Sequence, residues 1–161
     1  MRDLVAGVVA VALVFVALSL GGTLQGYRRR RRRAREHERS LGRTIVAELP
    51  TGDDLVLFTE DAEHFHYGDQ AVAKSDIVAA RVLINGSPIA SVVSPRYHGE
   101  MAPPTSFEDR PEGIARDRWD VAIETAEGTT LVVCGAIRER VSQELARAVF
   151  DAVKKSVEKL S

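Results

Sequence analysis

Two histidines at alternate positions, His64 and His66, have the spacing that comes nearest to a metal site. On a strand, residues two apart share one face, so both imidazoles would point the same way. Glu63, Asp69 and His37 could supply further ligands. Structural zinc sites use four well-spaced ligands, and these residues lack that spacing. We therefore expect no metal and no cofactor, and an exposed strand face that carries two histidines.

The only cysteine, Cys134, stands next to Gly135 at the end of a predicted strand. A nucleophilic cysteine needs a base within reach and a group that orients the base. The candidate base, His98, is remote in the sequence. Phosphate-binding glycine loops, paired catalytic carboxylates and Ser/His/Asp arrangements are not evident. We expect a buried thiol and no enzyme activity. A lone cysteine forms no intrachain disulfide, as is usual in a reducing compartment.

The N-terminal region has the pattern of a membrane anchor. Residues 4–24 carry no charge, and a helix of that length rises about 31 Å, close to a hydrocarbon core of about 30 Å. Nine arginines follow between Arg28 and Arg43, and positive charge there resists translocation. The pattern predicts a transmembrane anchor over 1–27, in the inner (cytoplasmic) membrane of a bacterium. It would be single-pass, with the N-terminus outside and the C-terminal domain cytoplasmic. A cleaved signal peptide is the alternative.

The net charge of −1 hides an uneven distribution. Residues 28–43, the arginine-rich collar, hold nine arginines against two glutamates, a net charge of +7. Residues 44–161 hold twelve lysines and arginines against twenty acidic residues, a net charge of −8. We expect the collar to bind anionic lipid headgroups, at about 1 kcal/mol per basic residue. Nucleic acid is not expected, because the acidic domain would repel its phosphates. The residues assigned to the membrane surface are Arg28, Arg29, Arg30, Arg31, Arg32, Arg33 and Arg35.

Residues 44–161 are long enough for one domain with one core. Short runs with a period of two, separated by turn residues such as Gly68-Asp69 and Asn85-Gly86, predict about seven or eight strands. From Ile137 to Leu160 the apolar spacing becomes that of an amphipathic helix of about six turns. The predicted strands cover 44–49, 55–59, 64–67, 70–73, 77–84, 89–93, 119–124 and 129–134.

This order of elements resembles the bacterial pleckstrin-homology-like (PH-like) domain. The run from Trp119 to Ile123, the turn at Gly128 and the amphipathic helix Glu144–Lys155 carry the resemblance. With the anchor, it predicts an α+β fold: an N-terminal transmembrane helix, then a PH-like antiparallel β roll or barrel capped by a long C-terminal helix. The resemblance implies binding of proteins, peptides or lipid headgroups without catalysis. The family's headgroup sites are basic patches between early strands, whereas the early hairpins here are acidic, which argues against phosphoinositide binding. The acidic residues are Asp53, Asp54, Glu60, Asp61, Glu63 and Asp69.

Residues 94–118 form a predicted loop that is long for a compact domain, and such loops are often functional. Its prolines and aromatic residues suit an arm that lies over another protein. A loop without a function is the alternative. The predicted partner-binding residues are Pro95, Tyr97, Met101, Pro103, Pro104 and Phe107.

The sequence thus predicts a non-catalytic, membrane-anchored accessory or scaffold subunit. It would dock on the cytoplasmic face of a larger membrane protein complex, with other membrane protein subunits as partners. One alternative is a lipid-responsive membrane tether. The other is a membrane-tethered enzyme or ligand-binding regulator that uses Cys134, His64 and His66.

Overall fold

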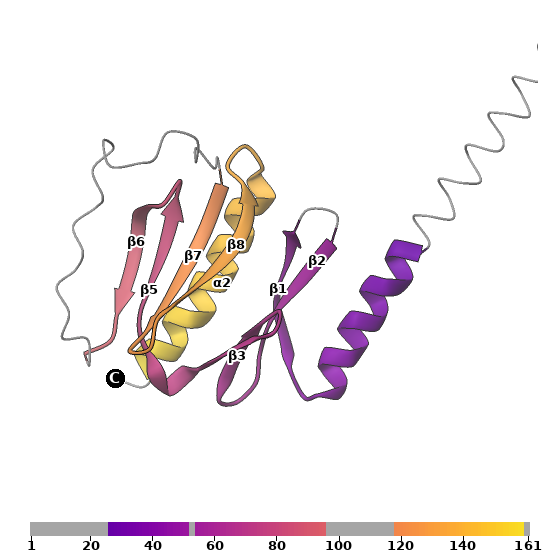
Figure 1. Ribbon diagram of the computed structural model, residues 1–161, viewed down its shortest axis with the longest axis horizontal. Coiled ribbons are helices and arrows are strands. Elements are labelled where there is room, and N and C mark those ends of the chain that lie inside the picture. Colours follow the sequence, from indigo (N-terminus) through magenta and orange to yellow (C-terminus); the bar gives the residue numbers. More distant parts are fainter. Residues whose placement is uncertain (1–25, 52–53, 96–117, 160–161) are drawn as a thin grey trace, which may run out of the picture. The chain divides into compact units, whose positions relative to one another are not determined.

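The computed structural model describes residues 26–51, 54–95 and 118–159. The chain divides into two compact units, Met1–Ser40 and Leu41–Ser161. The described part of the first unit is a helix over residues 26–40, drawn in indigo in Figure 1. The second unit holds all the strands and a long C-terminal helix.

The predicted fold class is wrong at its N-terminal end. No helix within the described residues is long and apolar enough to span a membrane. The helix before the β domain is polar, with eight arginines between residues 26 and 40, and arginine is costly in hydrocarbon. A single-pass transmembrane architecture is therefore not what the structure describes. Residues 4–24, on which that prediction depended, lie outside the described part of the chain.

Two four-stranded antiparallel sheets build the second unit (Figure 1). The first sheet has the order β1-β2-β3-β4 and contains β1 (Thr44–Thr51), β2 (Asp54–Glu60), β3 (His64–Tyr67) and β4 (Gln70–Ala73). A 3₁₀ turn, η1 (Lys74–Asp76), leads into the second sheet. That sheet has the order β6-β5-β7-β8 and contains β5 (Ile77–Ile84), β6 (Ser87–Val93), β7 (Arg118–Thr125) and β8 (Thr129–Ala136).

Turn residues explain the hairpins. Gly68, Asn85 and Gly86 have φ values of 58°, 52° and 80°, which two-residue hairpin turns require and which glycine and asparagine tolerate best. The chain therefore reverses at Gly68-Asp69 between β3 and β4, and at Asn85-Gly86 between β5 and β6. β7 does not pair with β6, the preceding strand, but with the other side of β5.

The C-terminal helix α2 (Arg140–Lys159) supplies one wall of the core. Its buried residues Ala146, Val149, Val153 and Val157 recur every three or four positions, so they form one stripe. The helix contacts β5, β7, β1 and β8, and the residues of the stripe belong to the shared core. Figure 1 shows the helix beside the second sheet. The helix begins at residue 140, later than the predicted 137, because a turn intervenes in which the Glu139 amide donates to the carbonyl of residue 136 at 3.2 Å.

Candidate functional site

The helix over residues 26–40 presents the densest charge of the described chain. All six arginines from Arg28 to Arg33 are exposed, and Arg35 is half-buried. Arginines at positions 28, 31, 35 and 39 recur every three or four residues, so they line one side of the helix. A planar guanidinium can donate two hydrogen bonds to one phosphate or carboxylate. This side of the helix is therefore suited to phosphate groups. The helical form of the arginine-rich segment was not predicted from the sequence.

One carboxylate of the same helix partly neutralises the basic side. The Nε of Arg32 donates to Oε1 of Glu36 at 2.7 Å, one helical turn away. Such exposed pairs contribute little net stability, because water and salt screen the two charges. The helix therefore retains a strongly positive field around Arg28–Arg33.

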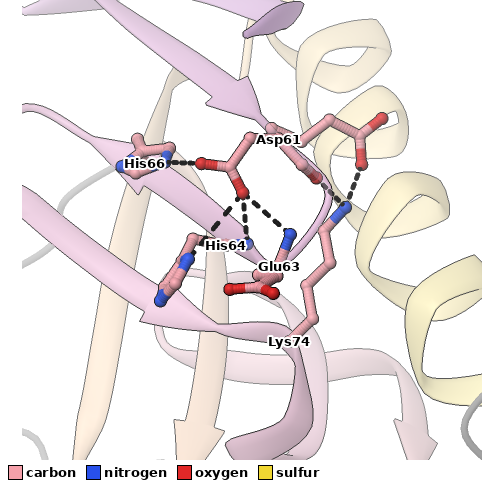
Figure 2. A network of polar contacts seen from close by, with 6 residues as sticks. Asp61, Glu63, His64, His66 and Lys74 are labelled. Atoms are coloured by element: carbon pink, nitrogen blue, oxygen red, sulfur yellow. Dashed lines mark hydrogen bonds and ion pairs between the residues drawn. The ribbon is translucent and has the colours of Figure 1, made fainter. Parts of the chain in front are cut away.

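The β2–β3 turn holds a polar cluster around Asp61 (Figure 2). One carboxylate oxygen of Asp61 accepts hydrogen bonds from the backbone amides of Glu63 and His64, at 2.8 and 2.7 Å. The other oxygen lies 2.7 Å from Nε2 of His66. The bond to His66, and then the two amide bonds, hold the pKa of Asp61 well below its usual range. The carboxylate thus stays ionised and fixes the turn.

Lys74 extends the cluster from the other end of the β3–β4 hairpin. Its Nζ donates to Oε2 of Glu60 at 2.9 Å and to the backbone carbonyl of Asp61 at 2.7 Å. The same Nζ lies 4.7 Å from the centre of the Phe65 ring, a distance at which a cation is attracted to the ring face. The lysine therefore ties β4 to the end of β2.

The two predicted histidines do lie together. The rings of His64 and His66 have centroids 6.0 Å apart, and both approach Asp61, at 3.8 Å for Nδ1 of His64. Within the described residues, however, no group of three His, Cys, Asp or Glu side chains could hold a metal ion. The carboxylate of Asp61 already accepts hydrogen bonds from two backbone amides. The evident role of the cluster is therefore to hold the β2–β3 turn in shape.

Cys134 is fully buried in the core. Its Sγ donates to the carbonyl of Val132 at 3.6 Å. Burial, and to a lesser extent the negative charge of Asp120, raise the pKa of Cys134 to about 12. The side chain is therefore a neutral thiol at physiological pH, whereas a cysteine nucleophile must be a thiolate. The candidate base His98 lies outside the described residues.

The predicted docking arm, residues 94–118, is described only at its two ends, and Arg118 already belongs to β7. Pro95 follows β6 and is exposed. The other predicted partner-binding residues, namely Tyr97, Met101, Pro103, Pro104 and Phe107, lie outside the part of the chain that the structure describes. Their role stays a prediction.

The roles of Asp61 and Lys74 in holding this cluster together were not predicted from the sequence. The signal for Asp61 was present, because an aspartate just after a strand often binds amides two and three residues later. Lys74 had no such signal, since its partners are fourteen and thirteen positions away. Comparison with protein-family models, with curated proteins and with solved structures found no match. The resemblance to PH-like domains therefore stays a prediction.

Proposed function

We propose that this protein is a non-catalytic scaffold or accessory subunit. Its arginine-rich helix binds an anionic lipid surface, and its acidic β domain binds a partner protein of a membrane complex, at the cytoplasmic face. The proposal does not use a membrane-spanning helix. The observation that carries it is the helix over residues 26–40, which exposes six consecutive arginines.

The opposite net charges of the two units support different binding roles for them. Residues 28–43 carry a net charge of +7, and residues 44–161 a net charge of −8. An anionic lipid surface attracts the first segment and repels the second. The β domain should therefore stand away from the headgroups, where its surface can meet another protein. The same repulsion disfavours nucleic acid, whose phosphates extend well beyond a single helix.

Vesicle binding tests the lipid half of the proposal. Full-length protein is mixed with phosphatidylcholine vesicles that either contain or lack phosphatidylglycerol. Apolar attraction acts on both kinds of vesicle, so the ratio of the two affinities reports the headgroup charge. We expect stronger binding to the anionic vesicles, and a weaker preference as salt is added. Replacing Arg28–Arg33 with glutamine should lower the ratio by at least about ten-fold, given about 1 kcal/mol per residue.

A matched control places the same kind of change on the β domain. Arg138, Arg140 and Arg147 are exposed, and their replacement with glutamine should leave the ratio unchanged. An equal ratio for the wild type and the Arg28–Arg33 variant would refute lipid binding by the helix.

Gentle extraction tests the partner half. We expect the protein to emerge from mild detergent in a stoichiometric assembly with another protein. Recovery as a lone monomer in several mild detergents would contradict the scaffold role.

A further inference from the structure

A groove of about 670 Å³ runs beside strand β4. One wall is β4 and η1, and the other is the turn between β7 and β8 with the start of β8. β4 is the last strand of the first sheet, and β8 is the last strand of the second. The groove therefore lies between two strand edges, each of which is paired on one side only among the described strands.

The backbone of β4 offers hydrogen-bonding groups to this groove. Opposed residues of an antiparallel pair alternate between bonded and non-bonded positions. The Lys74 amide donates to the carbonyl of Glu63 at 2.8 Å, so residues 63 and 74 form a bonded pair. On β4, Ala73 and Ala71 lie one and three positions before residue 74. Because the two kinds of pair alternate, both residues belong to non-bonded pairs. Their N–H and C=O groups therefore point away from β3, toward the open edge.

The start of β8 has the same property. The Thr125 amide donates to the Gly128 carbonyl at 2.8 Å, so the next pair, Glu124 with Thr129, is non-bonded. By the same alternation Val133 is also a non-bonded position. Its amide indeed points away from β7 and donates to the hydroxyl of Tyr67 at 3.4 Å. The backbone N–H and C=O groups of Thr129 therefore point away from β7, toward the open edge of β8. This edge lies at the opposite wall of the groove.

The side chains leave this edge open. Natural proteins usually protect a sheet edge with lysine, proline or a bulge. Ala71 and Ala73 have small side chains, and the β3–β4 pairing has no bulge. The neighbouring Lys74 does not cover the edge, because its Nζ is held by Glu60 and the Asp61 carbonyl.

The charges of the groove select the kind of strand it would accept. Two carboxylates, Asp76 and Glu127, belong to the lining, and none of its described residues is a lysine or arginine. A strand with basic side chains would gain both backbone hydrogen bonds and charge attraction there.

We propose that the edge of β4 binds an extended, basic segment of a partner protein as an added strand. This inference rests on the proposed scaffold function and assigns the partner-binding surface. Ala71 and Ala73 supply the main-chain hydrogen bonds, while Asp76 and Glu127 select for lysine or arginine.

Amide exchange and chemical shifts of the full-length protein test the proposal. The probe is a short synthetic peptide of alternating lysine and valine, and the comparison peptide alternates glutamate and valine. The basic peptide should slow exchange of the Ala71 and Ala73 amides and shift their resonances together with that of Thr129. Changes confined to other strands would overturn the proposal. Protection of these amides that rises with protein concentration, without peptide, would assign the edge to a second copy of this chain instead.

Substitutions separate the backbone and charge contributions. Ala71→Pro removes one outward N–H but no β3–β4 ladder bond, and should weaken binding of the basic peptide about ten-fold or more. Asp76→Asn with Glu127→Gln should weaken binding several-fold and reduce its salt dependence. Glu144→Gln with Asp151→Asn, on exposed positions of α2, is the matched control and should change nothing.

Unchanged binding to both the Ala71→Pro and the Asp76/Glu127 variants would refute the edge site. If Ala71→Pro does not fold, the amide-exchange result on the wild type still decides. These changes leave the arginine-rich helix intact, so the vesicle experiment is independent of them. If the Ala71→Pro and Asp76/Glu127 variants still form a stoichiometric complex with the partner, this inference is wrong, whereas the proposed scaffold function is not contradicted.

Discussion

Replacing Asp61 separates two roles that one carboxylate plays in the β2–β3 turn. Asp61→Ala removes the acceptor for two backbone amides, at 2.8 and 2.7 Å, and the partner of His66 at 2.7 Å. Side-chain caps of this kind are worth about 1 kcal/mol each, and the Asp61 side chain is 31% exposed, which weakens the charged contact with His66. We expect Asp61→Ala to lower the free energy of unfolding by about 2–3 kcal/mol at pH 7.

Asp61→Asn keeps an oxygen for both amides, but it loses the charge and places an NH₂ group where the second oxygen lies 2.7 Å from Nε2 of His66. It should therefore cost less, about 1 kcal/mol. Urea unfolding at constant pH measures both variants, and the difference between their costs reports the two amide hydrogen bonds that Asn keeps and Ala loses. If Asn costs as much as Ala, or if Ala costs less than about 0.5 kcal/mol, within the range of an ordinary surface change, the amide bonds do not hold the turn.

The pH dependence gives a second test of the same carboxylate. The pKa of Asp61 is lower in the folded chain than in the unfolded chain, where an aspartate titrates near about 3.9. Its stabilisation is therefore fully present above about pH 4 and is lost progressively as the pH falls below that value. The stability difference between wild type and Asp61→Ala should shrink in this range. A difference that grows on acidification would contradict the reasoning.

Two further predictions concern the core. At Gly135, with φ of 116°, an added Cβ would lie 2.5 Å from Oγ of Ser142, so Gly135→Ala should cost about 2–4 kcal/mol in thermal unfolding. Gly26→Ala is the control, because no described residue beyond its neighbours and its own helix backbone lies within 4 Å of the added Cβ. Equal effects of the two substitutions would contradict the clash. Cys134 should resist iodoacetamide in the folded protein and react on unfolding, because it is buried and its pKa is about 12. Rapid labelling of the native chain would show that the thiol is accessible.

Local chemistry explains which elements were predictable. The bounds of β3, β4 and β5 agree with the prediction, because Gly68-Asp69 and Asn85-Gly86 specify tight turns between runs of alternating side chains. The pairing of β5 with β7 was not predicted, because it joins strands separated by more than thirty residues and no local signal encodes it.

The N-terminal helix and the polar cluster show what could not be predicted from the sequence. A run of arginines has no apolar period, so the helix over residues 26–40 could not be inferred from hydrophobic spacing. The histidine pair was recognised, but its surroundings depend on Asp61, whose carboxylate accepts the turn amides and contacts His66. Spacing identified the histidines there, whereas Asp61, the residue that joins them, was not singled out.

The ratio of binding to anionic and neutral vesicles tests the central claim most directly. We predict that the full-length protein prefers anionic vesicles and that replacing Arg28–Arg33 with glutamine removes most of this preference. The control replacements at Arg138, Arg140 and Arg147 should keep it. The claim that this helix binds a negatively charged surface would be contradicted by either of two results. The wild-type protein could bind both kinds of vesicle equally, or the glutamine variant could keep the full preference for anionic vesicles.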